Sequence, residues 1–109
     1  ANNGRAKLPP MGWNSWYALG CDNLNETAVQ NNADIMASEW NGLPSLLSFG
    51  YQFLVLDDCW MAYHRDQNGN MIADPEKFPS GMASLSNSVR DLGLQMGLYT
   101  TPGNKYFFQ

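Results

Sequence analysis

The stretch that decides the fold is Leu54-Val55-Leu56-Asp57-Asp58-Cys59-Trp60-Met61, where an apolar run ends abruptly at two carboxylates. The run from Phe53 to Leu56 has no polar alternation, and this pattern predicts a strand that is buried on both faces. Such strands belong to parallel sheets that are covered by helices. In parallel α/β folds, functional side chains gather at the edge of the sheet where the strands end. Asp57 and Asp58 are therefore predicted to lie at a functional edge.

The segments around this strand alternate between strand and helix patterns. Residues 11–16 and 94–99 predict two further strands, and the central strand is predicted to begin at Tyr51. Apolar residues spaced three and four apart predict two amphipathic helices. The first helix carries Val29, Ala33, Met36 and Trp40, and the second carries Met82, Leu85, Val89 and Leu92. The order strand, helix, strand, helix, strand predicts an α/β fold with a parallel sheet.

Polar residues and glycines mark where these elements begin and end. Asn25 and Ser80 are predicted to be the N-caps of the two helices. The helices are predicted to end at Asn41-Gly42 and at Gly93. In the long loop between the central strand and the second helix, Asn68-Gly69 predicts the turn of a small β-ribbon.

Composition and charge exclude several classes of partner. The 109 residues include six Lys and Arg, spread along the chain, and carry a net charge of −4. The sequence shows no basic patch, so we expect neither nucleic acid nor an anionic membrane as a partner. No apolar run approaches the ~18 residues that a membrane span requires. With 44% hydrophobic residues the chain can form a core, and we predict one domain over residues 1–109 with no second domain.

Two features resemble metal ligands without matching a metal site. His64 is the only histidine and has no Cys, His or carboxylate partner at metal spacing, which indicates a residue on a surface loop. Asp66-x-Asn68-x-Asn70 resembles the start of a calcium loop. However, Met71 stands where that loop needs glycine, and Lys77 stands where it needs glutamate. We therefore predict no metal ion and no cofactor.

Three features bear on the compartment. Residues 1–5 lack the apolar stretch of a signal peptide, so we expect either a cytosolic protein or a processed N-terminus. Asn25-Glu26-Thr27 is an acceptor sequence for N-glycosylation and favours the second interpretation. Cys21 and Cys59 each follow a predicted strand. From the residues alone, a bridge between them and two buried free thiols remain equally open.

Aromatic residues make up 13% of the chain and include four Trp. Sugar sites often combine aromatic faces, which pack on the apolar faces of sugars, with carboxylates that accept hydrogen bonds from hydroxyl groups. Trp is also a common core residue. The composition therefore indicates sugar chemistry without establishing it.

A set of motifs connects the chain with a known family. The motifs are Pro9-Pro10-Met11-Gly12-Trp13-Asn14-Ser15-Trp16, Gly50-Tyr51, Asp57-Asp58-Cys59-Trp60, Arg65-Asp66, Gly69, Phe78-Pro79-Ser80-Gly81-Met82, and Gly93-Leu94 through Gly97-Leu98-Tyr99. From about Leu8 to Tyr99, the chain resembles the start of the α-galactosidases of glycoside hydrolase family 27. The first and third of these motifs together are highly specific.

The resemblance implies a (β/α)8 TIM barrel, of which this chain forms the N-terminal part, about the first three strands and the two helices between them. It implies a sugar pocket lined by Trp16, Asp57, Asp58 and Tyr99. The substrate would be an α-galactoside or another carbohydrate, and the two aspartates would bind galactose hydroxyls. The family pairs Cys59 with Cys21 in a disulfide, which implies a secreted, vacuolar or lysosomal protein.

The same resemblance places no catalytic residue in this chain. The family's nucleophilic aspartate ends the fourth strand and its acid/base aspartate lies later, so neither position occurs before Gln109. A retaining glycosidase needs two carboxyls about 5–5.5 Å apart on opposite sides of the bond. Asp57 and Asp58 are adjacent and would approach a substrate from one side, which favours two acceptors for hydroxyl groups. We therefore expect the 109-residue segment alone to be inactive.

Several alternatives remain open at the level of the sequence. After Tyr99, the stretch Thr100-Thr101-Pro102 departs from the family pattern, and no cysteine is present for the family's second bridge. A sibling activity on N-acetylgalactosaminides, arabinopyranosides or isomaltose-type substrates is therefore an alternative. A galactose-binding or inactive fragment is another, and a third interpretation has Asp57 and Asp58 merely facing solvent. The sequence does not indicate the oligomeric state.

Overall fold

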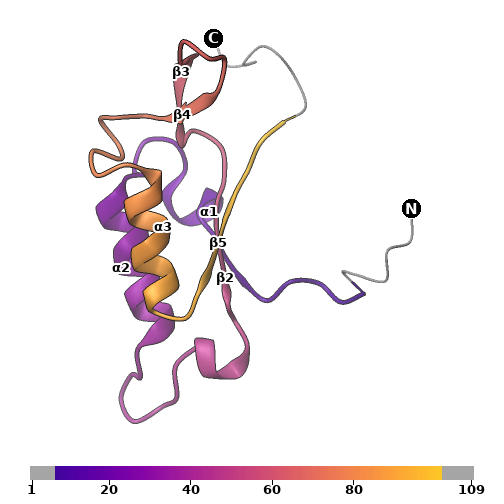
Figure 1. Cartoon of the computed structure of the whole chain (residues 1–109). Coiled ribbons are helices and arrows are strands. Elements are labelled where there is room, and N and C mark those ends of the chain that lie inside the picture. Colours follow the sequence, from indigo (N-terminus) through magenta and orange to yellow (C-terminus); the bar gives the residue numbers. More distant parts are fainter. Residues whose placement is uncertain (1–6, 102–109) are drawn as a thin grey trace.

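The computed structural model describes residues 7–101, and its main feature is a small parallel sheet with two helices on one side (Figure 1). In chain order the elements are β1 (Gly12–Asn14), α1 (Trp16–Leu19), α2 (Glu26–Ala37), the 3-10 helix η1 (Leu47–Phe49), β2 (Phe53–Leu56), β3 (Met61–Arg65), β4 (Met71–Ala73), α3 (Met82–Asp91) and β5 (Gln95–Leu98). Strand β2 lies between β1 and β5 and pairs with both in parallel. The predicted α/β unit with a parallel sheet is confirmed. The predictions for residues 102–109 lie outside the described residues.

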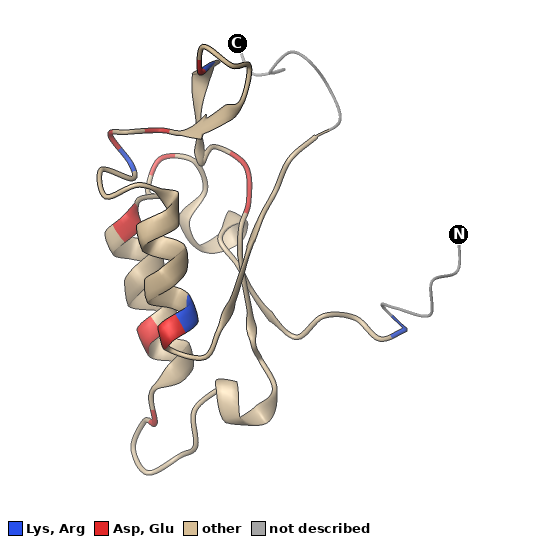
Figure 2. Cartoon of the chain, in the orientation of Figure 1, with Lys and Arg blue, Asp and Glu red and all other residues tan. Residues whose placement is uncertain are grey.

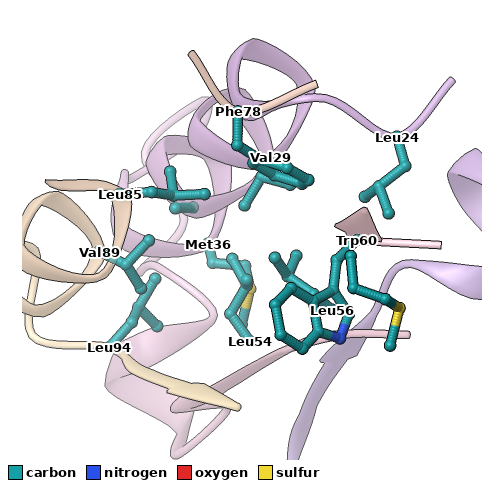
Figure 3. Packing of buried hydrophobic residues seen from close by; sticks show 12 residues of the cluster. Leu24, Val29, Met36, Leu54, Leu56, Trp60, Phe78, Leu85, Val89 and Leu94 are labelled. Carbon is teal, nitrogen blue, oxygen red and sulfur yellow. The ribbon is translucent and has the colours of Figure 1, made fainter. Parts of the chain in front are cut away.

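The hydrophobic core lies between the sheet and the two long helices. Leu54 and Leu56 of β2 are fully buried and belong to one cluster with residues of both helices (Figure 3). The helix residues of this cluster are Val29, Ala33 and Met36 from α2 and Leu85 and Val89 from α3. The apolar stripes that predicted the two helices therefore face the sheet.

The prediction that the central strand is buried on both faces is wrong within residues 7–101. Along β2, the side chains of Phe53 and Val55 are only half-buried, whereas those of Leu54 and Leu56 are buried. In β5, Gln95 and Leu98 are exposed. The reason is that α2 and α3 cover one face of the sheet, and alternate residues of a strand point to opposite faces (Figure 1).

The first strand is shorter than predicted and ends at Asn14. The side chain of Asn14 accepts a hydrogen bond from the backbone N–H of Trp16 at 2.8 Å, and the chain turns there into α1. Trp16 is thus the first residue of a short helix and not the last residue of the strand. Gly12 lies so close to β2 that a Cβ atom on it would meet the backbone of Phe53.

Helix α2 begins as predicted but ends early. Asn25 is its N-cap, and the Asn25 side chain accepts a hydrogen bond from the backbone N–H of Ala28 at 2.9 Å. The helix ends at Ala37, because Ser38 adopts an extended conformation. Trp40, which we expected on the buried stripe, is instead 75% exposed and pairs through its backbone with Leu43 across a tight turn.

The cap predicted for the second helix is also wrong. Gly81, with φ at 80°, occupies the N-cap position of α3, a conformation that favours glycine. Ser80 instead donates to the carboxylate of Glu26 through its backbone N–H and its hydroxyl, both at 3.0 Å. These contacts join the starts of α2 and α3.

The loop between β2 and α3 contains the predicted β-ribbon. Strands β3 and β4 pair in an antiparallel arrangement, and Gly69 in their turn has φ at 81°. His64 lies on β3 and is exposed. Across residues 7–101, none of the helices has the length and apolar character needed to cross a membrane.

Candidate functional site

The four residues predicted to form a pocket lie at the edge of the sheet where its parallel strands end. Asp57 and Asp58 follow β2, Tyr99 follows β5, and Trp16 comes two residues after the end of β1. Figure 2 shows the acidic segment directly after β2. Trp16 is 41% exposed and Tyr99 is 37% exposed, while both aspartates are half-buried. This edge therefore combines two aromatic faces and two carboxylates within reach of solvent.

The carboxylate of Asp57 is oriented by the end of β1. Its Oδ2 accepts a hydrogen bond from Nδ2 of Asn14 at 2.8 Å, and its Oδ1 accepts one from the backbone N–H of Asp58 at 2.8 Å. The backbone N–H of Asp57 donates to Oγ of Ser15 at 2.9 Å. Ser15 is itself only 1% exposed, and its N–H donates to the carbonyl of Val55 at 3.1 Å. Neighbouring strands thus fix both the backbone and the carboxylate of Asp57.

Asn14 and Ser15 belong to this candidate site through their contacts with Asp57, and the sequence did not single them out, although both stand in a motif that carries the family resemblance. A signal for them was present in the pattern. They lie near the end of the first predicted strand, residues 11–16, and residues at the ends of neighbouring parallel strands meet at one edge. The register of the sheet pairs Asn14 with Val55, two residues before Asp57.

The carboxylate of Asp58 lies in a different local arrangement. Its Oδ1 accepts a hydrogen bond from the backbone N–H of Cys59 at 2.7 Å. Among the contacts of residues 7–101, its Oδ2 has no hydrogen-bond partner. That oxygen is therefore available to accept a hydrogen bond from a ligand.

An open hollow of about 430 Å³ lies beside Asp58. Its lining residues are Cys21, Asp22, Asp58, Cys59, Met61, Ala62, Tyr63, Asp74 and Lys77. Of the four predicted pocket residues, only Asp58 lines it. The hollow therefore lies next to the aromatic and acidic edge and does not coincide with it.

Trp60 connects β2 with the end of β5. Its side chain is 5% exposed, and its indole N–H donates to the carbonyl of Tyr99 at 2.8 Å. The backbone N–H of Tyr99 donates in turn to the carbonyl of Leu56 at 2.8 Å. Because the N–H and the carbonyl of Tyr99 both make hydrogen bonds, the backbone that carries the Tyr99 ring is fixed against β2.

Cys21 and Cys59 form a disulfide, with their Cα atoms 5.3 Å apart. The predicted bridge is confirmed, and it joins the loop after α1 to the turn after β2. Nζ of Lys77 donates to the carbonyls of both cysteines at 3.0 Å. Sequence analysis noted Lys77 only as a residue that does not fit a calcium loop.

The arrangement of the edge fits the recognition of hydroxyl groups. Ionised carboxylates are acceptors with several lone pairs, so Asp57 and Asp58 can each accept from a ligand while keeping their internal hydrogen bonds. Exposed faces of Trp16 and Tyr99 can pack on an apolar surface. In the part of the chain that the structure describes, no three His, Cys, Asp or Glu side chains gather as a metal site would require.

Comparison with known proteins identifies the family. The model of the family described as Alpha galactosidase A matches residues 8–107. The chain belongs to this α-galactosidase family. The resemblance noted in the sequence motifs is confirmed.

Individual relatives agree with this assignment. An α-galactosidase of Cyamopsis tetragonoloba is 47% identical over 105 residues, which cover 96% of this chain and 24% of the relative. The α-galactosidase A of Homo sapiens is 38% identical over 114 residues, which cover 95% of this chain and 25% of the relative. The chain thus spans about a quarter of the length of the curated relatives it matches.

Solved structures of the family share the fold of this chain. The α-galactosidase I of Mortierella vinacea superposes with a TM-score of 0.79 at 40% identity, covering 92% of this chain and 24% of that structure. An α-galactosidase of Saccharomyces cerevisiae, solved with raffinose, superposes with a TM-score of 0.74 at 31% identity. That match covers 90% of this chain and 20% of the yeast structure.

Proposed function

We propose that this chain belongs to a retaining α-galactosidase, which hydrolyses terminal α-D-galactosyl residues, and that it supplies part of the galactose pocket. The observation that carries the proposal is the pair of oriented carboxylates, Asp57 and Asp58, at the carboxyl edge of a parallel sheet in a chain of the α-galactosidase family. The described sheet, with β1, β2 and β5 alternating with α2 and α3, would be the N-terminal part of a (β/α)8 barrel.

In this proposal the four edge residues hold the sugar and do not perform the chemistry. Asp57 and Asp58 accept hydrogen bonds from galactose hydroxyls, while Trp16 and Tyr99 border the sugar with their rings. Adjacent aspartates on one strand end approach a substrate from one side. A retaining mechanism needs two carboxyls about 5–5.5 Å apart on opposite sides of the bond, so we assign the nucleophile and the acid/base to residues outside this chain. Residues 1–109 alone would then be inactive.

The test uses the active protein that contains this chain. We expect it to hydrolyse nitrophenyl α-galactoside and raffinose, the sugar present in the yeast structure. Asp57→Asn and Asp58→Asn should each lower kcat/KM by hundreds-fold or more, because a site built to bind a hydroxyl discriminates on the order of 10⁴-fold when that contact is lost. Asp91→Asn, at the far end of α3, is the matched control and should keep full activity.

Two results would count against this function. Normal activity in either Asp57→Asn or Asp58→Asn would remove that residue from the pocket. A clear preference for α-N-acetylgalactosaminide, arabinopyranoside or isomaltose-type substrates over α-galactosides would assign the protein to a sibling activity.

A second candidate is a galactose-binding protein without turnover. It is favoured by one observation, which is that the two oriented carboxylates of the described edge are adjacent residues at the end of one strand. Calorimetric titration with galactose separates the two candidates. Saturable binding that is lost in Asp57→Ala, together with no hydrolysis of any α-galactoside, would establish the binding protein.

We further propose a secreted, vacuolar or lysosomal protein with a glycan on Asn25. The Cys21–Cys59 disulfide supports an oxidising compartment, and the Asn25 side chain is exposed at the start of α2. Mass spectrometry that finds extra mass on Asn25, removable by a glycosidase and absent from Thr27→Ala, would support this proposal. Thr27→Ala is suitable because it removes the acceptor sequence and keeps the helix cap at Asn25. Asn25 without a glycan in protein secreted from a eukaryotic host would count against it.

A further inference from the structure

Lys77 occupies an unusual place beside the disulfide. Its side chain is half-buried, and its ammonium group donates to the carbonyl of Cys21 and to the carbonyl of Cys59, each at 3.0 Å. These carbonyls belong to residues 56 and 18 positions earlier in the chain. A buried or half-buried ammonium makes its strongest hydrogen bonds as a charged donor, so both contacts restrain the backbone.

The backbone around Lys77 is also tied to other elements. The carbonyl of Lys77 accepts a hydrogen bond from the N–H of Glu26, the first residue of α2, at 2.9 Å. The N–H of Phe78, the next residue, donates to the carbonyl of Asp74 at 2.9 Å, and the Phe78 side chain is only 2% exposed. The base of the Lys77 side chain is therefore held, and its ammonium group acts from a fixed position.

Cys59, one of the two restrained residues, has an unfavourable backbone conformation. Its φ is 74°, in the left-handed region that residues with a Cβ atom rarely adopt. The N–H of Cys59 donates a hydrogen bond to Oδ1 of Asp58 at 2.7 Å, so this turn also holds the Asp58 carboxylate. The disulfide to Cys21 and the hydrogen bond from Lys77 both act on Cys59. The geometry of Asp58 therefore depends on a turn that needs outside support.

We propose that Lys77 is a positioning residue for Asp58. By holding the carbonyl of Cys59, the ammonium group keeps the turn in its left-handed conformation, which in turn fixes the Asp58 carboxylate with Oδ2 free for a ligand. This inference rests on the proposed function, because it assumes that Asp58 binds a sugar hydroxyl.

The experiment compares Lys77 variants in the active protein that contains this chain. Lys77→Met removes both hydrogen bonds and keeps most of the side-chain volume. Lys77→Arg keeps a charged donor that can serve two carbonyls, and Lys77→Gln keeps one neutral donor. Arg90→Met is the control for loss of a positive charge, since Arg90 lies in the last turn of α3 and contacts Asn87.

We expect Lys77→Met to raise KM for nitrophenyl α-galactoside and Kd for galactose together, by about tenfold or more, because misplacement of a binding group by about 1 Å can lower activity on the order of 100-fold. Lys77→Arg should restore most of the affinity, Lys77→Gln should fall between, and Arg90→Met should match the unmodified protein. KM and Kd refer to folded protein, whose amount is measured by circular dichroism and by titration of active sites.

A merely structural role predicts a different pattern. If Lys77→Met or, should that variant not fold, Lys77→Gln lowers the melting temperature while KM and Kd of the folded protein stay unchanged, the proposal is wrong. Calorimetry with galactose keeps the two proposals separate. Galactose binding without hydrolysis by the unmodified protein would overturn the proposed enzymatic function and still test Lys77 through Kd. Absence of both binding and hydrolysis would overturn both proposals.

Discussion

At the scale of single residues, the most informative feature is how completely Asp57 is held. Both of its carboxylate oxygens accept hydrogen bonds inside the protein, and its N–H donates to a buried hydroxyl. A carboxylate fixed in this way can meet a ligand without losing side-chain freedom on binding, which favours affinity. Asn14 supplies the side-chain contact that comes from another strand.

Replacement of Asn14 tests this arrangement. In the active protein, Asn14→Ala removes the donor to Asp57 and the acceptor for the N–H of Trp16, so two residues of the proposed pocket lose an anchor. We expect kcat/KM for nitrophenyl α-galactoside to fall by about tenfold or more, with the fold retained. Asn31→Ala, on the exposed side of α2, is the control and should keep full activity. Unchanged kinetics in Asn14→Ala would show that Asp57 is oriented without it.

At the scale of elements, the contact between β1 and β2 requires glycine at one position. A Cβ atom on Gly12 would meet the backbone of Phe53, which cannot move without breaking the pairing of the two strands. Gly97 in β5 differs, because a Cβ atom there would lie 3.4 Å from a side-chain atom of Val55, an ordinary contact. The same sheet thus offers one intolerant and one tolerant glycine.

This difference gives a prediction about stability. Gly12→Ala should lower the free energy of unfolding by about 3 kcal/mol or prevent folding, as overpacking against a fixed backbone does. Gly97→Ala should change it by less than about 1.5 kcal/mol, since it adds one methyl group where space exists. Urea unfolding of the protein that contains this chain measures both values. Equal effects of the two substitutions would contradict the strand register described here.

The β3–β4 ribbon carries a second element-scale feature, in its turn. The side chain of Asp66 accepts hydrogen bonds from Nδ2 of Asn70 at 3.0 Å and from the backbone N–H groups of Asn70 and Asn68 at 2.7 and 2.9 Å. These donors stabilise the charged form, the Asn70 side chain most of all, and lower the pKa of Asp66 below its ordinary value of 3.8. Because the folded pKa is the lower one, ionised Asp66 stabilises the turn above pH 3.8. That contribution is lost as the pH falls through the lowered pKa.

An NMR titration of the Asp66 carboxyl group checks this pKa. We expect a value below 3.8 in the unmodified protein and a value closer to 3.8 in Asn70→Ala, which removes the side-chain donor. Asn68→Ala should leave the pKa of Asp66 unchanged, because Asn68 contributes only its backbone N–H. A shift in Asn68→Ala as large as that in Asn70→Ala would show that general loosening of the turn is the cause.

At the scale of the whole molecule, the disulfide joins the segments that follow the first two strands of the sheet. It connects residues separated by 38 positions, and Lys77 adds a third segment to the same junction. The loop that follows α1, the turn that carries Asp58 and the segment before α3 are therefore cross-linked at one junction. This explains how a site built from loops is held in place.

Opening the disulfide should reduce stability more than activity. In the chain-entropy model, a disulfide that closes a loop of this size stabilises the folded protein by about 3–4 kcal/mol. Cys21→Ser removes the bridge and should lower the free energy of unfolding by that order. Cys21→Ser keeps Cys59 and both carbonyls bound by Lys77, so we expect the folded fraction to keep measurable affinity for galactose. Mass spectrometry without reduction should show one linked peptide pair in the unmodified protein. Two thiols that react with an alkylating agent in the native protein would contradict the bridge.

Local pattern by itself determined the α/β class, the cap at Asn25, the β-ribbon and the apolar stripes that face the sheet, because each depends on neighbours a few residues apart. The motifs also placed the chain in its family, and with it the pairing of Cys21 with Cys59. The prediction that α2 extends to Trp40 was wrong, because a turn overrides the local helix pattern there. The prediction of Ser80 as the cap of α3 was also wrong, because Ser80 contacts Glu26 at the start of α2 and Gly81 takes the cap position.

Only the tertiary structure decided which residues support the site. Asn14 contacts Asp57 across 43 positions in the chain, Lys77 reaches Cys21 across 56, and Trp60 reaches Tyr99 across 39. None of these contacts has a local signature, because each joins residues at least 39 positions apart that only the folded chain brings together. Chemical type along the chain indicated where the carboxylates of the proposed pocket lie, whereas the side chains that orient them were determined by packing between distant segments.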